Sequence, residues 1–168
     1  MTTDEHMTES MENYLETILE LEKEFKVARA KQISDKLNVQ RGSVTGALKA
    51  LSDKGLINYA PYSFITLTTK GNRIAREITE RHRILKDFLL NVLQVDEDAA
   101  EKTACRMEHV VDPVTMERLM CFIDYIHNCP RAGDQWIESF INYCNCEKDD
   151  DACNACVETL LAEKKKDS

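Results

Sequence analysis

Apolar residues recur at helical spacing through the first third of the chain. Between residues 9 and 25 they form one stripe and predict an amphipathic helix. The polar face of this helix carries Glu12, Asn13 and Glu16. Two shorter stripes predict a helix that ends at Asn38 and another that ends near Gly55. Two short helices joined by a tight turn are typical of a helix-turn-helix.

A hairpin is predicted directly after this pair of helices. The segment LINYAPYSFITLTT contains two β-prone runs around residues 60–63, and such a hairpin would form the wing of a winged helix-turn-helix. A long helix should follow from about residue 70 to 93, capped by Thr69, with His82 on its apolar stripe.

Two further helices are expected in the second half of the chain. One covers residues 97–110, and Asp112 with Pro113 gives the start signals of the other, on which Cys121 belongs to the core. These helices have more apolar surface than one small domain needs. Packing against a second copy explains that surplus, and an internal core explains it nearly as well.

Charge is divided sharply along the chain, although the total of −8 alone would argue against a nucleic-acid partner. Residues 1–25 carry a net charge of −7, residues 26–86 carry +9, and residues 87–168 carry −10. A basic middle segment fits a DNA-contacting module, because neutralised phosphates supply most non-specific affinity. Clustering on a solvated face is the simpler alternative.

The second helix of a helix-turn-helix enters the major groove by its N-terminal end. Its residues opposite the apolar stripe can contact base edges or phosphates, and they are Gln40, Arg41, Ser43, Thr45 and Lys49. Tyr62 and Ser63 in the wing would reach the DNA backbone or minor groove. Arg29 and Lys31 would contact phosphate at the start of the preceding helix.

The segment Cys105-Arg106-Met107-Glu108-His109 places a thiol, a carboxylate and an imidazole on one face of a helix. His82, with Asn13 or Glu16, would complete a metal site if the helices pack as a bundle. This donor set suits Fe(II), Co(II), Ni(II) or Zn(II) better than Mg(II) or Ca(II). Each residue taken alone also has an ordinary structural role, as a buried thiol, a core histidine or a solvated carboxylate.

From about Ser10 to Trp136 the chain resembles the diphtheria toxin repressor and manganese transport regulator family of iron- and manganese-dependent repressors. The stretches that carry the resemblance are MENYLETILELEKE, ARAKQISDKLNVQRGSVTGALKALSDKGLI, LTTKG, RHRILKDFLL and ACRMEHV. The last is the most specific, because it matches the family's metal motif at the expected distance after the histidine of the long helix.

The resemblance implies a cytoplasmic, homodimeric repressor that binds palindromic double-stranded operator DNA when Fe(II) or Mn(II) is its corepressor. It implies that Cys105, Glu108 and His109 are ligands of the regulatory metal site. Glu16 and His82 match ligands of the manganese-type binuclear site, and Asn13 completes the set of six candidate ligands. Asn13 stands where iron-responsive members have Met and manganese-responsive members Asp. Lys86 and Glu101 stand where iron-type members have a Glu and a His of an accessory site, so that site is not expected in the same form.

The tail has a different composition. Cys144, Cys146, Cys153 and Cys156 form two close pairs, which suit a structural Zn(II) site. Unligated thiols, an iron–sulfur cluster and a redox disulfide are the alternatives. The acidic N-terminus has no apolar stretch, and no later run is long enough to span a membrane, so an exported or membrane protein is not expected.

Together these features predict a mainly α fold with three parts. Residues 1–72 would form a winged helix-turn-helix DNA-binding domain, residues 73–143 an all-helical metal-binding and dimerisation domain, and residues 144–168 the cysteine-rich tail. No phosphate loop or nucleophile elbow points to an enzyme or to a small organic substrate. The alternative function is a DNA-binding regulator controlled by zinc or thiol redox through the C-terminal cysteines.

Overall fold

The computed structural model of the chain describes residues 7–60, 63–128 and 133–145, which are mainly helical. The contacts divide the chain into two compact units. The first comprises Met1–Asp87 and Asp98–Val111, and the second Phe88–Glu97 and Asp112–Ser168. This is a division by packing, whereas the boundaries expected at residues 72 and 143 divide the chain by function and stay predictions.

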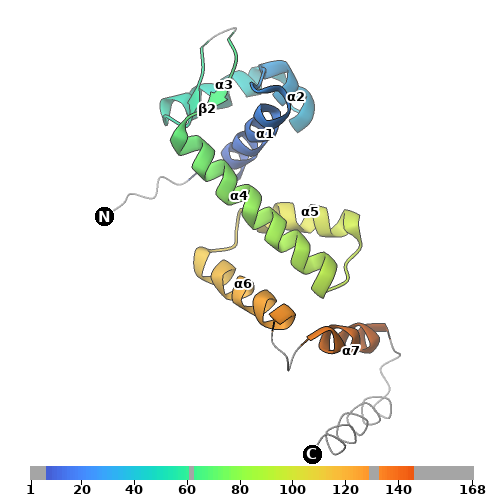
Figure 1. Cartoon of the computed structure of the whole chain (residues 1–168). Helices are drawn as coiled ribbons and strands as arrows, with labels where there is room; N and C mark the ends of the chain where they lie inside the picture. Colours follow the sequence, from blue (N-terminus) through green and yellow to red (C-terminus); the bar gives the residue numbers. More distant parts are fainter. Residues whose placement is uncertain (1–6, 61–62, 129–132, 146–168) are drawn as a thin grey trace, which may run out of the picture. The chain divides into compact units, whose positions relative to one another are not determined.

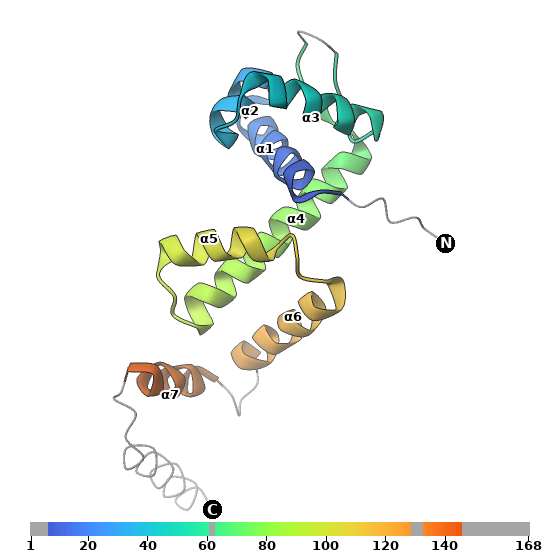
Figure 2. The same cartoon turned by 180° about the vertical axis from the view of Figure 1, so that it is seen from behind.

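The first unit begins with three helices that pack together, α1 (Glu9–Phe25), α2 (Ala30–Leu37) and α3 (Arg41–Asp53) (Figures 1 and 2). The Thr8 side chain accepts a hydrogen bond from the Met11 amide and caps α1. Asn38 ends α2 in the left-handed conformation, which asparagine tolerates better than most residues. The predicted helix-turn-helix is therefore confirmed. Its core includes Leu15, Ile18, Ile33, Val44, Leu48 and Leu51, all buried.

The predicted wing is confirmed in its described strands, β1 (Ile57–Asn58) and β2 (Thr66–Leu67), which pair antiparallel. A bridge between Ala28 and Ile65 ties β2's side of the hairpin to the residues just before α2. From α1, the Glu22 carboxylate accepts a hydrogen bond from the Leu67 amide at 3.0 Å. The wing is thus anchored to the helices on two sides.

Helix α4 (Thr69–Asp87) follows the wing. The prediction that Thr69 caps it was wrong by one residue, because the Thr68 hydroxyl accepts the hydrogen bond from the Gly71 amide. Gly71 presses directly against the Leu56 backbone, where a Cβ would collide with the carbonyl group. The start of α4 is therefore fixed against the base of the wing.

The single helix expected from residue 70 to 93 is interrupted after Asp87 by a π-helical turn, η1 (Phe88–Val92), in which Leu89 and Val92 are buried. Helix α5 (Glu97–Met107) runs beside α4 in the views of Figures 1 and 2. It ends three residues earlier than predicted, because the Met107 carbonyl oxygen accepts from both Val110 and Val111.

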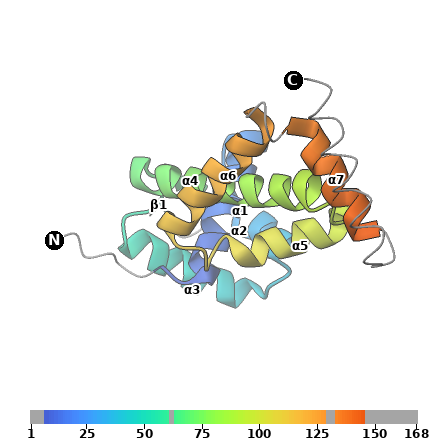
Figure 3. The same cartoon turned by 90° about the horizontal axis from the view of Figure 1, so that it is seen from below.

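The second unit contains α6 (Pro113–Asn128) and α7 (Gly133–Asn145), which pack against each other (Figure 3). The Asp112 carboxylate caps α6 by accepting from the Val114 and Thr115 amides. The expectation that Cys121 lies in the core was wrong, because its side chain is exposed on α6. Large apolar side chains exposed on this helix are Val114, Met120, Phe122 and Tyr125. None of the helices in the described ranges is long and apolar enough to cross a membrane.

Candidate metal centre and DNA-contacting surface

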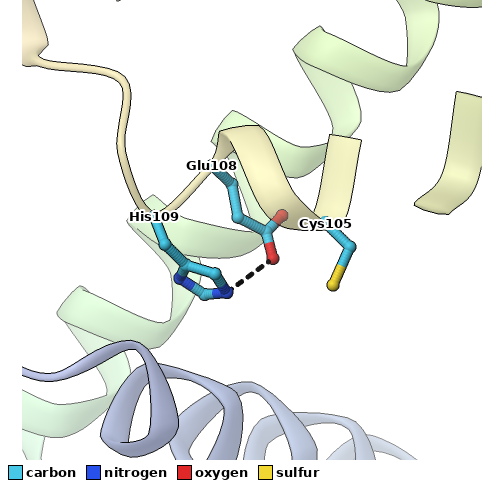
Figure 4. A group of neighbouring side chains, drawn as sticks. All are labelled: Cys105, Glu108 and His109. Atoms are coloured by element: carbon cyan, nitrogen blue, oxygen red, sulfur yellow. Dashed lines mark ion pairs between the residues drawn. The ribbon is translucent and has the colours of Figure 1, made fainter. Parts of the chain in front are cut away.

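Polar side chains from three helices of the first unit meet at one place. Helix α1 contributes Asn13 and Glu16, α4 contributes His82, and Cys105 lies in the last turn of α5. Glu108 and His109 follow in the turn after α5 rather than within the helix, as Figure 4 shows. The Cys105 sulfur, a Glu108 oxygen and a His109 ring nitrogen all lie within 4.8 Å of one another.

The Glu108 carboxylate is the centre of this group. Its side chain is only 1% exposed, and its two oxygens face two different imidazoles. Oε2 lies 2.6 Å from Nδ1 of His82, and Oε1 lies 3.3 Å from Nε2 of His109. A buried carboxylate is costly unless it is paired, so the two histidines are what keep it there.

The His109 ring is held from both sides by residues of α1. Its Nδ1 lies 2.6 Å from Glu12 Oε2, and its Nε2 lies 3.0 Å from Asn13 Oδ1. Sequence reasoning placed Glu12 on the polar face of this helix but assigned it no role. Its position one residue before Asn13 was the only signal. In the structure Glu12 is the carboxylate that orients His109, which leaves Nε2 directed toward Glu108 and Asn13.

His82 has a similar arrangement on its outer side. Its Nε2 lies 3.3 Å from Glu101 Oε1, and the other oxygen of that carboxylate pairs with Lys86 Nζ at 2.8 Å. The hydrogen bond from Lys86 lowers the pKa of Glu101 below its usual value. Glu101 is therefore a carboxylate held in its charged form beside the imidazole of His82.

A cavity of about 190 Å³ lies among these groups and is lined by Asn13, Glu16, His82, Glu101, Cys105 and Glu108, together with other residues of α1, α2 and α4. Burial, together with the nearby Glu108 carboxylate, raises the pKa of Glu16 to about 7. Burial also raises the pKa of Glu108 and of the Cys105 thiol. A raised pKa means that the protonated form of Glu16, Glu108 and Cys105 is favoured, and each group would lose its proton more readily beside a cation.

The donor set fits a divalent transition-metal ion. Asn13, Glu16, His82, Cys105 and Glu108 line the cavity, and His109 lies beside Cys105 and Glu108. Without a cation there, the Glu108 carboxylate helps to raise the pKa of Glu16. Glu12 and Glu101 contact the ring nitrogens of His109 and His82 that do not face Glu108, and Glu101 also lines the cavity. This is the usual arrangement of outer carboxylates that orient metal-binding histidines.

The surface expected to meet DNA is exposed on α3. Val44, Leu48 and Leu51 are buried against the core, and the opposite side of the helix faces outward. On that side all five predicted residues are exposed: Gln40, Arg41, Ser43, Thr45 and Lys49. The Thr45 hydroxyl donates to the Arg41 carbonyl oxygen at 3.2 Å, so it is already engaged within the helix.

The remaining predicted DNA contacts lie around the wing and the start of α2. Arg29 and Lys31 are exposed at the N-terminal end of α2, and Ser63 is exposed in the wing. The Arg29 guanidinium stacks over the Phe64 ring, 5.2 Å from its centroid. Tyr62 lies outside the described residues.

Of the four tail cysteines, Cys144 is exposed near the end of α7. Cys146, Cys153 and Cys156 lie outside the described residues. The predicted zinc site therefore stays a prediction.

Comparison with known proteins agrees with both parts of this description. Residues 6–65 match the N-terminal DNA-binding domain of the iron-dependent repressors, and residues 68–137 match their metal-binding and dimerisation domain. The chain is 36% identical over 119 residues to an uncharacterised HTH-type transcriptional regulator of Methanocaldococcus jannaschii. This match covers 70% of this chain and 95% of that protein. It is also 36% identical over 117 residues to the transcriptional regulator MntR of Escherichia coli, covering 70% and 75% of the two chains.

Among solved structures, the manganese regulator SloR superposes with a TM-score of 0.63 at 33% identity. The match covers 74% of this chain but only 58% of SloR, so the chain spans little more than half of that longer protein. SloR is a manganese regulator, and the matched family model is a metal-binding domain, so these comparisons do not favour a regulator that senses through its tail thiols.

Proposed function

This chain belongs to the iron-dependent repressor family of metal-responsive, DNA-binding transcription regulators, and from that premise we propose how it senses metal. Six side chains would hold the ion: Asn13, Glu16, His82, Cys105, Glu108 and His109. The observation that carries this assignment is the Glu108 carboxylate, 1% exposed and placed between two imidazoles. When bound, the ion would supply the positive charge that the buried carboxylates lack.

The preferred ion should be Fe(II), followed by Mn(II). The thiol of Cys105 favours the softer ion, and Asn13 offers a neutral amide oxygen where a carboxylate would favour a harder one. Burial raises the pKa of the thiol, so Cys105 would bind as a thiolate only when metal displaces its proton. The thiol therefore adds selectivity for metals that bind sulfur well.

The ion would act by joining α1 to the end of α5, which hydrogen bonds from His109 to Glu12 and Asn13 also connect. Asn13 and Glu16 lie on α1, which packs against α2 and the wing. Cys105, Glu108 and His109 lie at the end of α5. Ligands on both sides would hold α1 in one position, and the DNA-competent state would be favoured to the extent that it binds the ion more tightly.

DNA contact would come from the exposed side of α3 with support from Arg29, Lys31 and the wing. The exposed apolar side chains of α6 (Val114, Met120, Phe122 and Tyr125) fit association with a second copy, in line with the matched dimerisation domain. Two copies would place two α3 helices on one palindromic operator, with half-sites about 34 to 36 Å apart. The functional parts would be residues 1–72 for DNA and 73–143 for metal and dimerisation.

Cobalt(II) is a suitable probe for the metal site, because a Co(II)–thiolate bond adds a charge-transfer band in the near ultraviolet. We expect that band on titration with Co(II) of a chain in which Cys144, Cys146, Cys153 and Cys156 are serine, so that the predicted tail site does not contribute, and its loss when Cys105→Ser is added. Cys121→Ser in the same background is the matched control, since Cys121 is exposed on α6 and should leave the band unchanged. A band that survives the addition of Cys105→Ser would show that the thiol ligand is another cysteine.

A further inference from the structure

A lysine stands at the edge of the metal centre. Lys86 lies on α4 one turn after His82, and its Nζ is 2.8 Å from Glu101 Oε2. The opposite oxygen of that carboxylate faces Nε2 of His82 at 3.3 Å. The Lys86 side chain is 29% exposed and the Glu101 side chain 52% exposed, so the pair lies partly in contact with water.

This pair changes how many cations the centre can accept. Glu101 lines the cavity, and a cation of the protein itself, Lys86, already pairs with its carboxylate, as Lys36 pairs with Glu20 at the same cavity. A second divalent ion bound to Glu101 would share that carboxylate with the ammonium of Lys86. Two cations that share one carboxylate lie close together, and they repel each other strongly where solvent screening is incomplete.

The pair also orients the first ion's ligands. With Nε2 of His82 directed at Glu101, the ring is fixed so that Nδ1 faces Glu108 at 2.6 Å. Lys86 in turn fixes the position of Glu101. Outer-layer partners of this kind hold the tautomer and direction of a metal-binding imidazole.

We propose that Lys86 supplies the second positive charge of this centre from within the protein, so that each chain binds one divalent ion and the Lys86–Glu101 pair positions His82. The proposal rests on the metal site of the preceding section. It predicts a centre with one ion, in which Glu101 is a positioning residue and not a ligand.

The test is the number of Mn(II) ions bound per chain, measured by equilibrium dialysis of the full-length protein and by electron paramagnetic resonance. Mn(II) is chosen because it binds poorly to thiolates, so the tail cysteines contribute little. We expect one ion per wild-type chain with the spectrum of an isolated Mn(II). Two ions with a spin-coupled spectrum would overturn the one-ion centre but leave the metal site standing, whereas no bound ion would overturn both.

Two variants test the role of the lysine. Lys86→Glu should allow a second Mn(II) to bind, because it replaces the internal cation with a further ligand beside Glu101. Lys102→Glu makes the same charge change at an exposed position of α5 and should still bind one ion. Glu101→Gln should bind one ion about tenfold more weakly or worse, since His82 loses its charged partner. Unchanged affinity in Glu101→Gln, or one ion in Lys86→Glu, would overturn the role given to the pair.

Discussion

The side chain of Asn13 meets the imidazole of His109, with 3.0 Å between Oδ1 and Nε2, across 96 positions of sequence. Asn13 lies in the first half of α1, and Glu22 in the second half of the same helix accepts a hydrogen bond from the wing. One rigid helix thus contacts the candidate metal centre near one end and the wing near the other. A change at His109 can therefore reach the DNA-binding elements through α1.

Replacing His109 with alanine should abolish the response to metal. The variant loses one proposed ligand and the contacts of the ring with Glu12 and Asn13. In the wild-type chain we expect Fe(II) or Mn(II) to raise DNA affinity by roughly 5- to 150-fold, which corresponds to about 1 to 3 kcal/mol of coupling. Fluorescence anisotropy with a duplex selected for binding to the wild-type chain measures this ratio, and in His109→Ala it should fall to near one.

His127→Ala is the matched control for that experiment, because His127 is exposed on α6 in the second unit. Its metal response should equal that of the wild type. If His109→Ala keeps a wild-type metal response, the sensor site is not the one proposed.

Sequence reasoning succeeded where the signal is periodic and local. The stripe of Val44, Leu48 and Leu51 predicted both α3 and its exposed face, because burial on one side of a helix follows directly from spacing. It misplaced the N-terminal cap of α4 by one residue, because Thr68 and Thr69 are neighbouring threonines and the sequence alone does not distinguish them as caps. Only the backbone geometry decides which of them accepts from the Gly71 amide.

The metal centre shows the second limit. The Cys-x-x-Glu-His spacing identified three of its members, but the outer carboxylates depend on contacts between distant segments. Glu12 contacts His109, which lies 97 positions later in the sequence, and no pattern in either segment predicts this contact. Glu101 and Lys86 could each be noticed only as departures from the family, and their pairing depends on how α4 and α5 lie in the structure.

A methyl group at Gly71 should destabilise the first unit. An added Cβ would overlap the Leu56 carbonyl group, which is backbone and already accepts a hydrogen bond from the Thr68 amide. We expect Gly71→Ala to lower the free energy of unfolding by about 2 kcal/mol or more, measured by urea denaturation.

Gly46→Ala is the contrasting variant. Gly46 lies within α3 and has open space around the position of a Cβ, so alanine should stabilise the helix by up to about 1 kcal/mol. Equal stability of the wild type and Gly71→Ala would mean that α4 does not approach the wing as closely as described.

The cap at Asp112 should make the stability of the second unit depend on pH. Its side chain accepts from Thr115 and Val114, and the hydrogen bond from the Thr115 hydroxyl is the main reason its pKa is lowered. A carboxyl with a lowered pKa stabilises the fold above its unfolded-state pKa, and this contribution is lost as pH falls through the folded-state value. The melting temperature of Asp112→Ala should thus lie below that of the wild type at pH 7, with a smaller gap at pH 3.

Asp112→Asn separates the charge from the cap. Its amide oxygen still accepts from the backbone, so its difference from Asp112→Ala should be nearly independent of pH. A gap between the wild type and Asp112→Ala that stays constant from pH 7 to pH 3 would exclude an ionised cap.

The cysteine-rich tail should hold one Zn(II) per chain through Cys144, Cys146, Cys153 and Cys156. Four thiolates so close in sequence repel unless a cation or disulfides relieve them. Replacing Cys153 and Cys156 with serine should release the zinc, measured by a colorimetric chelator, while the thermal unfolding of the winged helix-turn-helix stays unchanged. Full zinc retention in this variant would place the ligands elsewhere.

Arg41 and Lys49 should both contribute to DNA affinity, in different ways. Arg41 opens α3, where a guanidinium can reach base edges, so Arg41→Ala should cost about 1 to 3 kcal/mol and relax specificity at one base pair. Lys49 lies two turns further along, and Lys49→Ala should weaken all sequences alike and reduce the salt dependence of binding. Anisotropy titrations at several salt concentrations measure both effects, with the exposed Lys102→Ala on α5 as the control. If both variants bind the selected duplex like the control, α3 is not the recognition helix.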